Sequence, residues 1–474
     1  MRTYSIALSD RVEATPKGAK VESGVRTLRS SGRDAFLTQR AQLYLLTVIV
    51  MMQISSLVDR SAMAVLVQEI KHDLSLSDFE ISLLQGLAFS LFYSTAGVFV
   101  ASLADRLPRR PIMFAGVVLW SIAAAATGLA RGFTSLFVAR MAVGFSETSV
   151  GPCATSMFAD GFPRRTLGRA IATYNAAGVA GLGVSLLATG WLLGRMESWR
   201  SLLPLGLSVL SPWRLVLITL ALPGFFVALL AFTVTDPPRR RDLNQASAIS
   251  WVDFCKIIII GRGFFLRLLL ANGLVTMVGY STIAWAPSYA RRVFHFSAAQ
   301  VGSAMGIIVG VIGVASAVLG GVLVDYFYLR GRRDAALLVP IVGSLLAVPL
   351  AIAGYVDQSP AMFIAGVITI QCFVQSQYGP LLTAIQMGSP SLVRGRTYAL
   401  FSLSSNFIGV ALGPLAVGVL TDFVFRSEAK VGYSLAILNA VCLPVAIWLL
   451  LRARRPFMDI LDQGRTQTSD TAAG

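Results

Sequence analysis

The chain has 474 residues, of which 55% are hydrophobic and only 14% carry a charge. A soluble chain typically has about 25% charged residues, so this composition indicates an integral membrane protein with several spans. The formal net charge is +16, but the basic residues fall between apolar runs, which is typical of membrane topology. We therefore expect no nucleic-acid partner.

Residues 1–40 are polar, and no apolar core with a cleavage site precedes Leu43. This pattern does not fit a secretory signal peptide, and we expect a flexible cytoplasmic tail, although an over-long start is also compatible. An apolar run of about 20 residues crosses a bilayer. Twelve such runs follow, at 43–70, 81–104, 111–130, 133–158, 168–194, 213–235, 264–290, 298–324, 335–355, 360–386, 397–424 and 432–451.

Basic residues distinguish the two sides of the predicted membrane protein. Arginines fill the short links after spans 2, 4, 8 and 10 and the longer link 236–262, so these links are expected in the cytoplasm. An even number of spans then places both termini in the cytoplasm. The protein itself is expected in the cell membrane (the inner membrane of a bacterium). The arginines of the 195–212 and 291–297 links are exceptions. The predicted domains are a tail at 1–40, six-helix bundles at 41–235 and 263–452, a linker at 236–262 and a tail at 453–474.

The two halves share sequence features at like places. Leu103, Asp105 and Arg110 close span 2, and Leu323, Asp325 and Arg330 close span 8 at a constant shift of 220 positions. A Gly-Arg pair also begins both span 5 and span 11. Such repeats indicate a duplicated bundle, with halves related by an axis along the membrane normal.

The stretch 101–110 resembles the loop signature G-x-L-x-D-R-x-G-R-R of the major facilitator superfamily, with Ala101 and Pro108 in place of its two glycines. The resemblance covers residues from about 40 to about 455 at the precision of predicted helix ends. It implies an all-α integral membrane protein with twelve transmembrane helices in two pseudo-symmetric six-helix bundles. It also implies a cytoplasmic gate in which helix-end charges pair in one conformation, although topology alone also explains them: Asp105, Arg106, Arg109, Arg110, Asp325 and Arg330.

Within that superfamily, Asp59-Arg60 in span 1, and Arg140 with 144–147 in span 4, resemble the spinster-like branch. This resemblance implies proton-coupled carriers of lysolipids or sphingoid phosphates. Charged residues inside a span are expensive and usually face a bundle interior or a cavity. Arg140 and Glu147 are seven residues apart and share one helix face, so we expect them to meet Asp59 and Arg60. We interpret these four residues as the proton-coupling group; a static salt bridge that only assembles the bundle is the alternative.

The second half has amides and aromatics where the first has charges: Gly279 stands 220 positions after Asp59. We predict a substrate cavity that suits an amphipathic ligand, although packing between helices explains any one of these residues equally well: Asn272, Tyr280, Trp285, Gln371, Gln375 and Gln377.

Two histidines, four distant cysteines and no phosphate-binding glycine loop predict no metal site, no cofactor, no disulfide and no enzyme. The expected partners are an amphipathic small molecule or lipid, protons and membrane lipids, and the chain is expected to be a monomer. The function that follows is proton-coupled secondary transport by alternating access. A passive channel, a gradient-independent lipid facilitator or scramblase, a drug exporter and a small organic-anion carrier remain alternatives.

Overall fold

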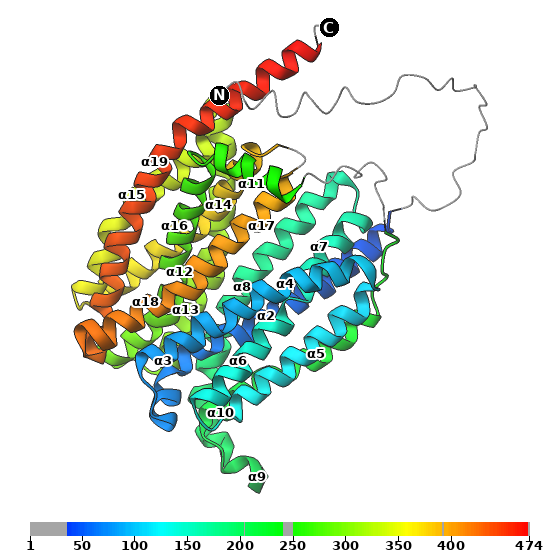
Figure 1. Cartoon of the computed structure of the whole chain (residues 1–474). Helices are drawn as coiled ribbons and strands as arrows, with labels where there is room; N and C mark the ends of the chain where they lie inside the picture. Colours follow the sequence, from blue (N-terminus) through cyan, green and yellow to red (C-terminus); the bar gives the residue numbers. More distant parts are fainter. Residues whose placement is uncertain (1–35, 203, 240–249, 391–392, 473–474) are drawn as a thin grey trace. The chain divides into compact units, whose positions relative to one another are not determined.

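The computed structural model describes residues 36–202, 204–239, 250–390 and 393–472, and every regular element in these ranges is a helix. Most of the predicted tail, together with Arg240, Arg241 and the rest of 240–249 in the linker, lies outside the described residues. Within the described residues, successive long helices run back and forth between the two ends of the molecule (Figure 1).

Spans 1 to 6 of the prediction correspond to helices in the same order. Their starts have the expected chemistry: Ser77 and Glu80 form a reciprocal capping box at α3, and Pro212 occupies the first turn of α10, where its missing N–H is not needed. The elements are α2 Gln39–Leu74, α3 Asp78–Ser82, η1 Leu83–Leu87, α4 Ala88–Arg106, α5 Arg109–Gly128, α6 Phe133–Glu147, α7 Val150–Gly161, α8 Arg164–Arg200, α9 Leu205–Ser208, α10 Pro212–Leu229 and η2 Leu230–Phe232.

Spans 7 to 12 follow a helix in the linker. Ser297 and Gln300 form a second capping box at α13, and four π-helical turns interrupt spans 2, 8 and 11. The elements are α11 Trp251–Ile260, α12 Phe265–Val293, α13 Ala298–Ile307, η3 Ile308–Ile312, α14 Gly313–Leu329, α15 Ala335–Val356, α16 Pro360–Met387, α17 Arg394–Ser404, η5 Ser405–Ala411, α18 Leu412–Val419, η6 Leu420–Phe425, η7 Glu428–Lys430 and α19 Val431–Ala472.

The twelve predicted spans are confirmed. In the described part of the chain, eleven helical segments are individually long and apolar enough to cross a membrane. The twelfth is span 4, which a turn at Thr148 and Ser149 divides into α6 and α7, each too short alone. Two boundaries differ from the prediction by more than five residues: α8 continues to Arg200, and α19 continues past residue 452 into the predicted tail.

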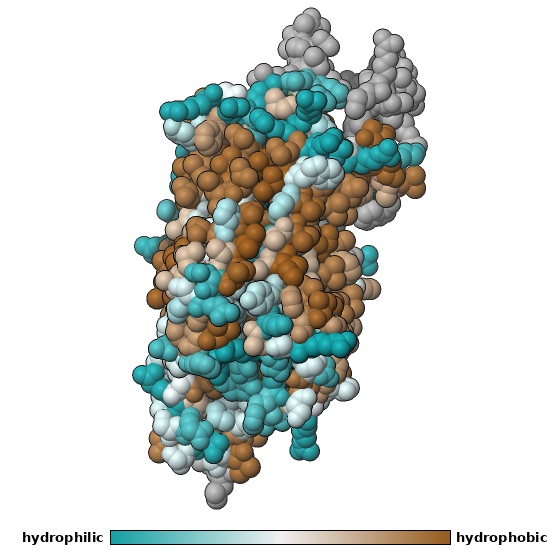
Figure 2. Space-filling model, turned by 90° about the vertical axis from the view of Figure 1, so that its left-hand side faces the viewer, coloured by the Kyte–Doolittle hydropathy of each residue, from teal (hydrophilic) through white to brown (hydrophobic). Residues whose placement is uncertain are grey.

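The lateral surface is that of a protein in lipid. Large apolar side chains such as Phe99, Phe226 and Leu346 are at least 70% exposed. Such exposure is unfavourable in water but not among lipid acyl chains. Figure 2 shows a broad hydrophobic area with hydrophilic residues toward both ends. We call these the α11 end and the α9 end, after the helices that Figure 1 places there.

Residues 36–239 (the first half) and 250–472 (the second half) meet along helix pairs of related position. Helix α2 packs on α12, α3 and α4 pack on α18 and η5, and α8 packs on α13 and η3. The last pair is the closest: a Cβ placed on Gly183 would lie 2.3 Å from the Cα of Gly310, and one on Gly190 would lie 2.9 Å from the Cα of Gly302. Glycine at these four positions lets the backbones touch.

Candidate functional site

The four predicted proton-coupling residues gather between α2 and α6. Ser56, one turn before Asp59, donates a 2.9 Å hydrogen bond to Glu147, which ties the two helices together. Asp59, Arg140 and Glu147 are each at most 6% exposed. Their charges act on one another, so the predicted meeting of spans 1 and 4 is found.

The expected ion pairs within this group are not found. Among the described residues, none of the ion pairs joins two of the four charges, and Oδ2 of Asp59 and Oε2 of Glu147 have no hydrogen-bond partner. The reason is that both arginines turn to other groups: Nε of Arg140 lies 3.4 Å from the carbonyl oxygen of Leu84. The carboxylates are therefore buried near positive charge without touching it.

Arg60 lies against aromatic rings from both halves. Its guanidinium carbon is 4.2 Å from the ring centre of Phe89, 5.8 Å from that of Tyr93 and 5.4 Å from that of Tyr280. Phe89 and Tyr93 belong to α4, whereas Tyr280 belongs to α12. The side chain that follows Asp59 in sequence thus connects the first half to the second through cation–π contacts.

A close helix crossing brings these rings to the site. A Cβ on Gly144 would lie 2.4 Å from the carbonyl oxygen of Phe89, so glycine allows α6 to approach α4 directly. The Phe89 ring then lies 5.8 Å from the guanidinium carbon of Arg140 and stacks on Tyr93 with ring centres 5.3 Å apart. The motif around Glu147 therefore supplies both a carboxylate and the crossing that positions its surroundings.

The predicted gate residues divide into two groups at the α11 end. Asp105, Arg106, Asp325 and Arg330 are exposed, and Arg330 lies over the ring of Tyr326. Arg110 is half-buried, and its Nε has no hydrogen-bond partner.

Arg109, in contrast, is 1% exposed and fastens the first half together. It forms ion pairs with Asp160 at 2.5 Å and with Asp236 at 2.7 Å, and it donates to Ser156 at 3.0 Å and to the carbonyl oxygen of Pro237. These bonds join the start of α5 to the end of α7 and to the start of the linker.

The ion pairs that connect the two halves lie at the α9 end. Arg291 binds both oxygens of Glu69 at 2.6 and 2.7 Å. Asp78, which has no exposed surface, binds Arg292 through both oxygens at 2.7 Å and also pairs with Lys71. Glu428 completes the group at 2.9 Å from Lys71 and 3.4 Å from Arg292. We call these six residues the α9-end cluster.

At the α11 end, the ion pairs found in the described part of the chain stay within one half. Besides the two pairs of Arg109, these are Arg454 with Asp334, Arg333 with Asp462, and Lys256 with Asp253 on α11. Charge pairing thus fastens the halves to each other at the α9 end, and fastens each half to itself at the α11 end.

The predicted cavity residues lie in different environments. Asn272 donates to Ser404 and Ser405 at 2.9 and 2.7 Å, and Trp285 donates to the carbonyl oxygen of Pro414 at 3.2 Å. All three bonds join α12 to span 11 within the second half, which favours interhelical packing for these two residues.

Two of the three glutamines have buried polar atoms without a hydrogen-bond partner. Gln371 and Gln377 are at most 2% exposed, and no amide atom of either side chain has a hydrogen-bond partner. Gln375 is half-buried on the same helix. Tyr280 contacts the charged group through Arg60.

The α9-end cluster was not among the predicted site residues, although a signal for it exists. Arg291 and Arg292 violate the expected charge asymmetry, and both bind acids of the first half. Phe89 and Tyr93 had no such signal, because aromatic residues four apart on an apolar helix are typical of ordinary packing.

The described residues contain no cluster of three or more histidine, cysteine or acidic side chains placed to hold a metal ion. The four cysteines are all unpaired thiols.

Comparisons with known proteins agree with this architecture. The MFS-type efflux pump of Mycolicibacterium smegmatis is 26% identical over 86% of this chain and 92% of its own length. The probable sphingolipid transporter spinster homolog 2 of Arabidopsis thaliana is 25% identical over 75% of this chain and 72% of its own. Spinster-like proteins are thus among the relatives, as the sequence resemblance predicted.

Solved structures show the same fold. The crystal structure of a bacterial homolog of the human lysosomal transporter Spinster, in an inward-facing and unoccupied conformation, superposes with a TM-score of 0.72 at 22% identity, over 90% of this chain and 98% of that one. Residues 44–414 match the family model of the Major Facilitator Superfamily. The chain is a multi-pass membrane protein with the twelve-helix fold, and it belongs to the Major Facilitator Superfamily.

Proposed function

We propose that this protein is a proton-coupled secondary transporter that moves an amphipathic lysolipid or sphingoid-phosphate-like anion by alternating access. The observation that carries this proposal is the group of two acids and two arginines, of which all but half-buried Arg60 are buried, and in which Arg60 also contacts the second half through Tyr280. A group that only assembled the first half would be expected to satisfy its carboxylates with direct ion pairs.

Charge balance supplies the coupling. With both acids ionised, the group is neutral. Protonation of Asp59 or Glu147 leaves one uncompensated positive charge in a buried site, which is costly. An anionic headgroup beside Arg60, whose Nη2 has no hydrogen-bond partner, restores neutrality. Proton and anion then favour each other's binding, and this coupling is reciprocal.

The cation–π contacts of Arg60 connect proton and anion binding in the first half to the second half. An anion that binds the guanidinium competes with the ring of Tyr280, and so changes a contact between halves. We assign substrate contacts to Tyr280 and the glutamines Gln371, Gln375 and Gln377 of α16, with apolar helix faces for the acyl chain. Asn272 and Trp285 are proposed to support this wall by packing.

The ion pairs define the state of the carrier. We propose that the α9-end cluster closes the outer side here, while Asp105, Arg106, Arg110, Asp325 and Arg330 close the cytoplasmic side in the opposite state. Arg109 holds the first half rigid in both. The arginine-rich α11 end is assigned to the cytoplasmic side of a cell membrane. Both termini then lie in the cytoplasm. The proposed rocking bodies are residues 41–235 and 263–452.

The test is transport of a labelled lysolipid in proteoliposomes, with and without an imposed pH gradient. Wild-type uptake should follow the gradient, whereas Asp59→Asn and Glu147→Gln should lose that response while keeping the wild-type melting temperature. Asp357→Asn is the matched control, because Asp357 is an exposed acid in the 9–10 link and should respond like wild type.

Other outcomes select the alternatives. If lysolipid moves equally with and without the gradient in all variants, the protein is a lipid facilitator and the buried charges are structural. If no lysolipid moves, a panel of drugs and small organic anions tests the exporter and anion-carrier functions. The drug arm is motivated by the efflux pump among the relatives.

A further inference from the structure

A groove of about 470 Å³ opens at the α11 end between α12 and α19. It is lined by Arg267 from the first turn of α12, and by Leu451, Arg452, Arg455 and Pro456 from α19. Arg267 donates a 2.6 Å hydrogen bond to the carbonyl oxygen of Arg452, which fixes the two helices at this point. Three of the five lining residues therefore carry positive charge.

These three arginines lack acidic partners in the described part of the chain. The nearby acids are engaged elsewhere, Asp334 with Arg454 and Asp462 with Arg333. Asp459 lies one turn beyond Arg455, but no ion pair joins them. Like charges placed together without compensation are unfavourable, so the groove is prepared for an anion.

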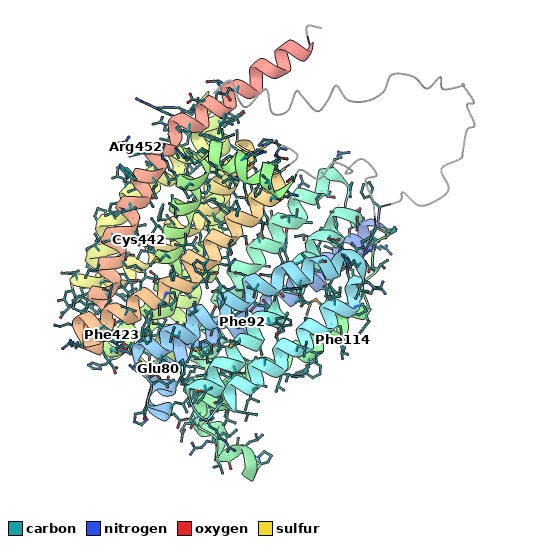
Figure 3. The ribbon with its side chains drawn as sticks, in the orientation of Figure 1. Glu80, Phe92, Phe114, Phe423, Cys442 and Arg452 are labelled. Atoms are coloured by element: carbon teal, nitrogen blue, oxygen red, sulfur yellow. The ribbon has the colours of Figure 1, made fainter. Side chains whose placement is uncertain are left out.

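The groove lies where a membrane span ends. Along α19, Val441, Val445, Trp448 and Leu451 are 41 to 56% exposed and form an apolar strip that leads to the groove. Arg452 lies 5.7 Å from the Trp448 ring centre, and tryptophan is enriched at the level of lipid headgroups. Figure 3 places Arg452 on α19 nearer the α11 end than Cys442, and Figure 2 shows hydrophilic residues above the hydrophobic area on this side.

The helix α11 borders the same region. Val252, Ile259 and Ile260 are 49 to 62% exposed on this short helix, as in helices that lie in the membrane interface. The turn that follows reaches the groove, since a Cβ on Gly263 would lie 3.5 Å from Pro456 and 4.0 Å from Arg267. The arginines thus have an apolar strip on one side and the turn that follows α11 on the other.

We propose that this groove binds the headgroup of an anionic phospholipid, with the acyl chains along the apolar strip of α19. Basic pockets between helices at the cytoplasmic side recognise anionic headgroups, and arginine holds phosphate through paired hydrogen bonds. The apolar strip of α19 favours a lipid over a free phosphate ion, because acyl chains can pack on apolar side chains and a phosphate ion cannot. The site lies on the lipid-facing side of the second half and is independent of the proposed transport cycle.

The experiment is native mass spectrometry of the detergent-purified protein with phosphatidylglycerol or phosphatidylcholine of identical acyl chains. Wild type should retain phosphatidylglycerol preferentially. The triple variant Arg267→Gln, Arg452→Gln, Arg455→Gln should bind it roughly 10- to 100-fold more weakly, because each basic residue near the headgroups contributes separately. The matched control is Arg165→Gln, Arg332→Gln, Arg394→Gln, which removes three exposed arginines elsewhere at the α11 end and should bind like wild type.

Three results would overturn the proposal. One is equal retention of phosphatidylglycerol by wild type and the groove variant when both have the same melting temperature. Another is equal binding of the two lipids by wild type. The third is displacement of the lipid by millimolar inorganic phosphate, which would identify an ion site. If the triple variant does not fold, Arg455→Gln alone tests the same preference, since Arg455 makes no ion pair with a described residue.

Discussion

The α9-end cluster gives the sharpest prediction, because its loss should shift the conformational equilibrium of the protein. Asp78→Asn keeps the side-chain shape and removes the charge that binds Lys71 and Arg292. Asp78 is fully buried, and the two cations are each 8% exposed. We expect the variant to populate the state that is open at the α9 end.

The magnitude follows from burial. Removal of one partner from a buried ion pair costs about 3–5 kcal/mol. Glu428 still lies near both cations, but it is 59% exposed, so it compensates only part of the loss. A net destabilisation of about 2 kcal/mol in the closed state changes the ratio of states about thirtyfold, since about 1.4 kcal/mol is tenfold.

The assay is pulsed electron spin resonance between labels on the two halves. Cysteines placed at Thr134, in the first turn of α6, and at Asp357, directly after α15, carry the labels after Cys255 and Cys372 are replaced by serine. Both positions are exposed at the α9 end. The Asp78→Asn variant should show a longer and more populated distance component than its parent.

The matched control is Asp253→Asn, which removes the acid of an exposed pair with Lys256 and should leave the distances unchanged. Identical distance distributions for Asp78→Asn and its parent would refute the reasoning, because they would mean that the cluster does not hold the halves together.

Three further predictions concern stability and packing. Arg109→Gln should lower the unfolding free energy by about 3–5 kcal/mol, measured as a lower melting temperature in detergent, because Asp160 and the linker lose their buried cation; an unchanged melting temperature would contradict this role. Gly183→Val should slow transport and destabilise the fold, since its side chain would collide with the backbone of α13, whereas Gly97→Val meets open space and should behave like wild type in both assays. Gln371→Leu should stabilise the protein by roughly 1 kcal/mol, because it replaces a buried amide without partners, yet should reduce substrate affinity; unchanged affinity would remove Gln371 from the substrate wall.

Much of the fold could be predicted because a bilayer imposes simple rules. Length and hydropathy located all twelve spans, and the repeat of Asp105 and Asp325 indicated two related halves. Span 4 shows the limit of this approach: the apolar run 133–158 located the span, but hydropathy gave no sign of the turn at Thr148 and Ser149 that divides it into two helices. The extra turns of α8 and α19 were missed because the predicted spans end where the apolar run ends. A helix can continue beyond that point as a polar helix outside the bilayer.

The site was predictable only in part. A charge inside an apolar run is visible in the sequence, so Asp59, Arg60, Arg140 and Glu147 could be identified and their helices matched. The partners of these residues could not be identified. Arg60 contacts aromatic rings that resemble ordinary core residues in the sequence, and no sequence spacing shows that α4 and α12 lie close together. The gate residues illustrate the same limit, since Arg109 differs from Arg110 only in the tertiary contacts that bury it.

The glycine crossing of α8 and α13 has a consequence for leverage. Gly183 stands 19 residues after the start of α8 and 17 before its end, so the two arms on either side are about 28 and 26 Å long at 1.5 Å per residue. A pivot near the middle of a rigid rod moves both tips by similar amounts in opposite directions. A rotation of about 20° there would displace each tip by roughly 10 Å at these arm lengths. Widening one mouth would narrow the other in the same motion, without any separate device to time the two events.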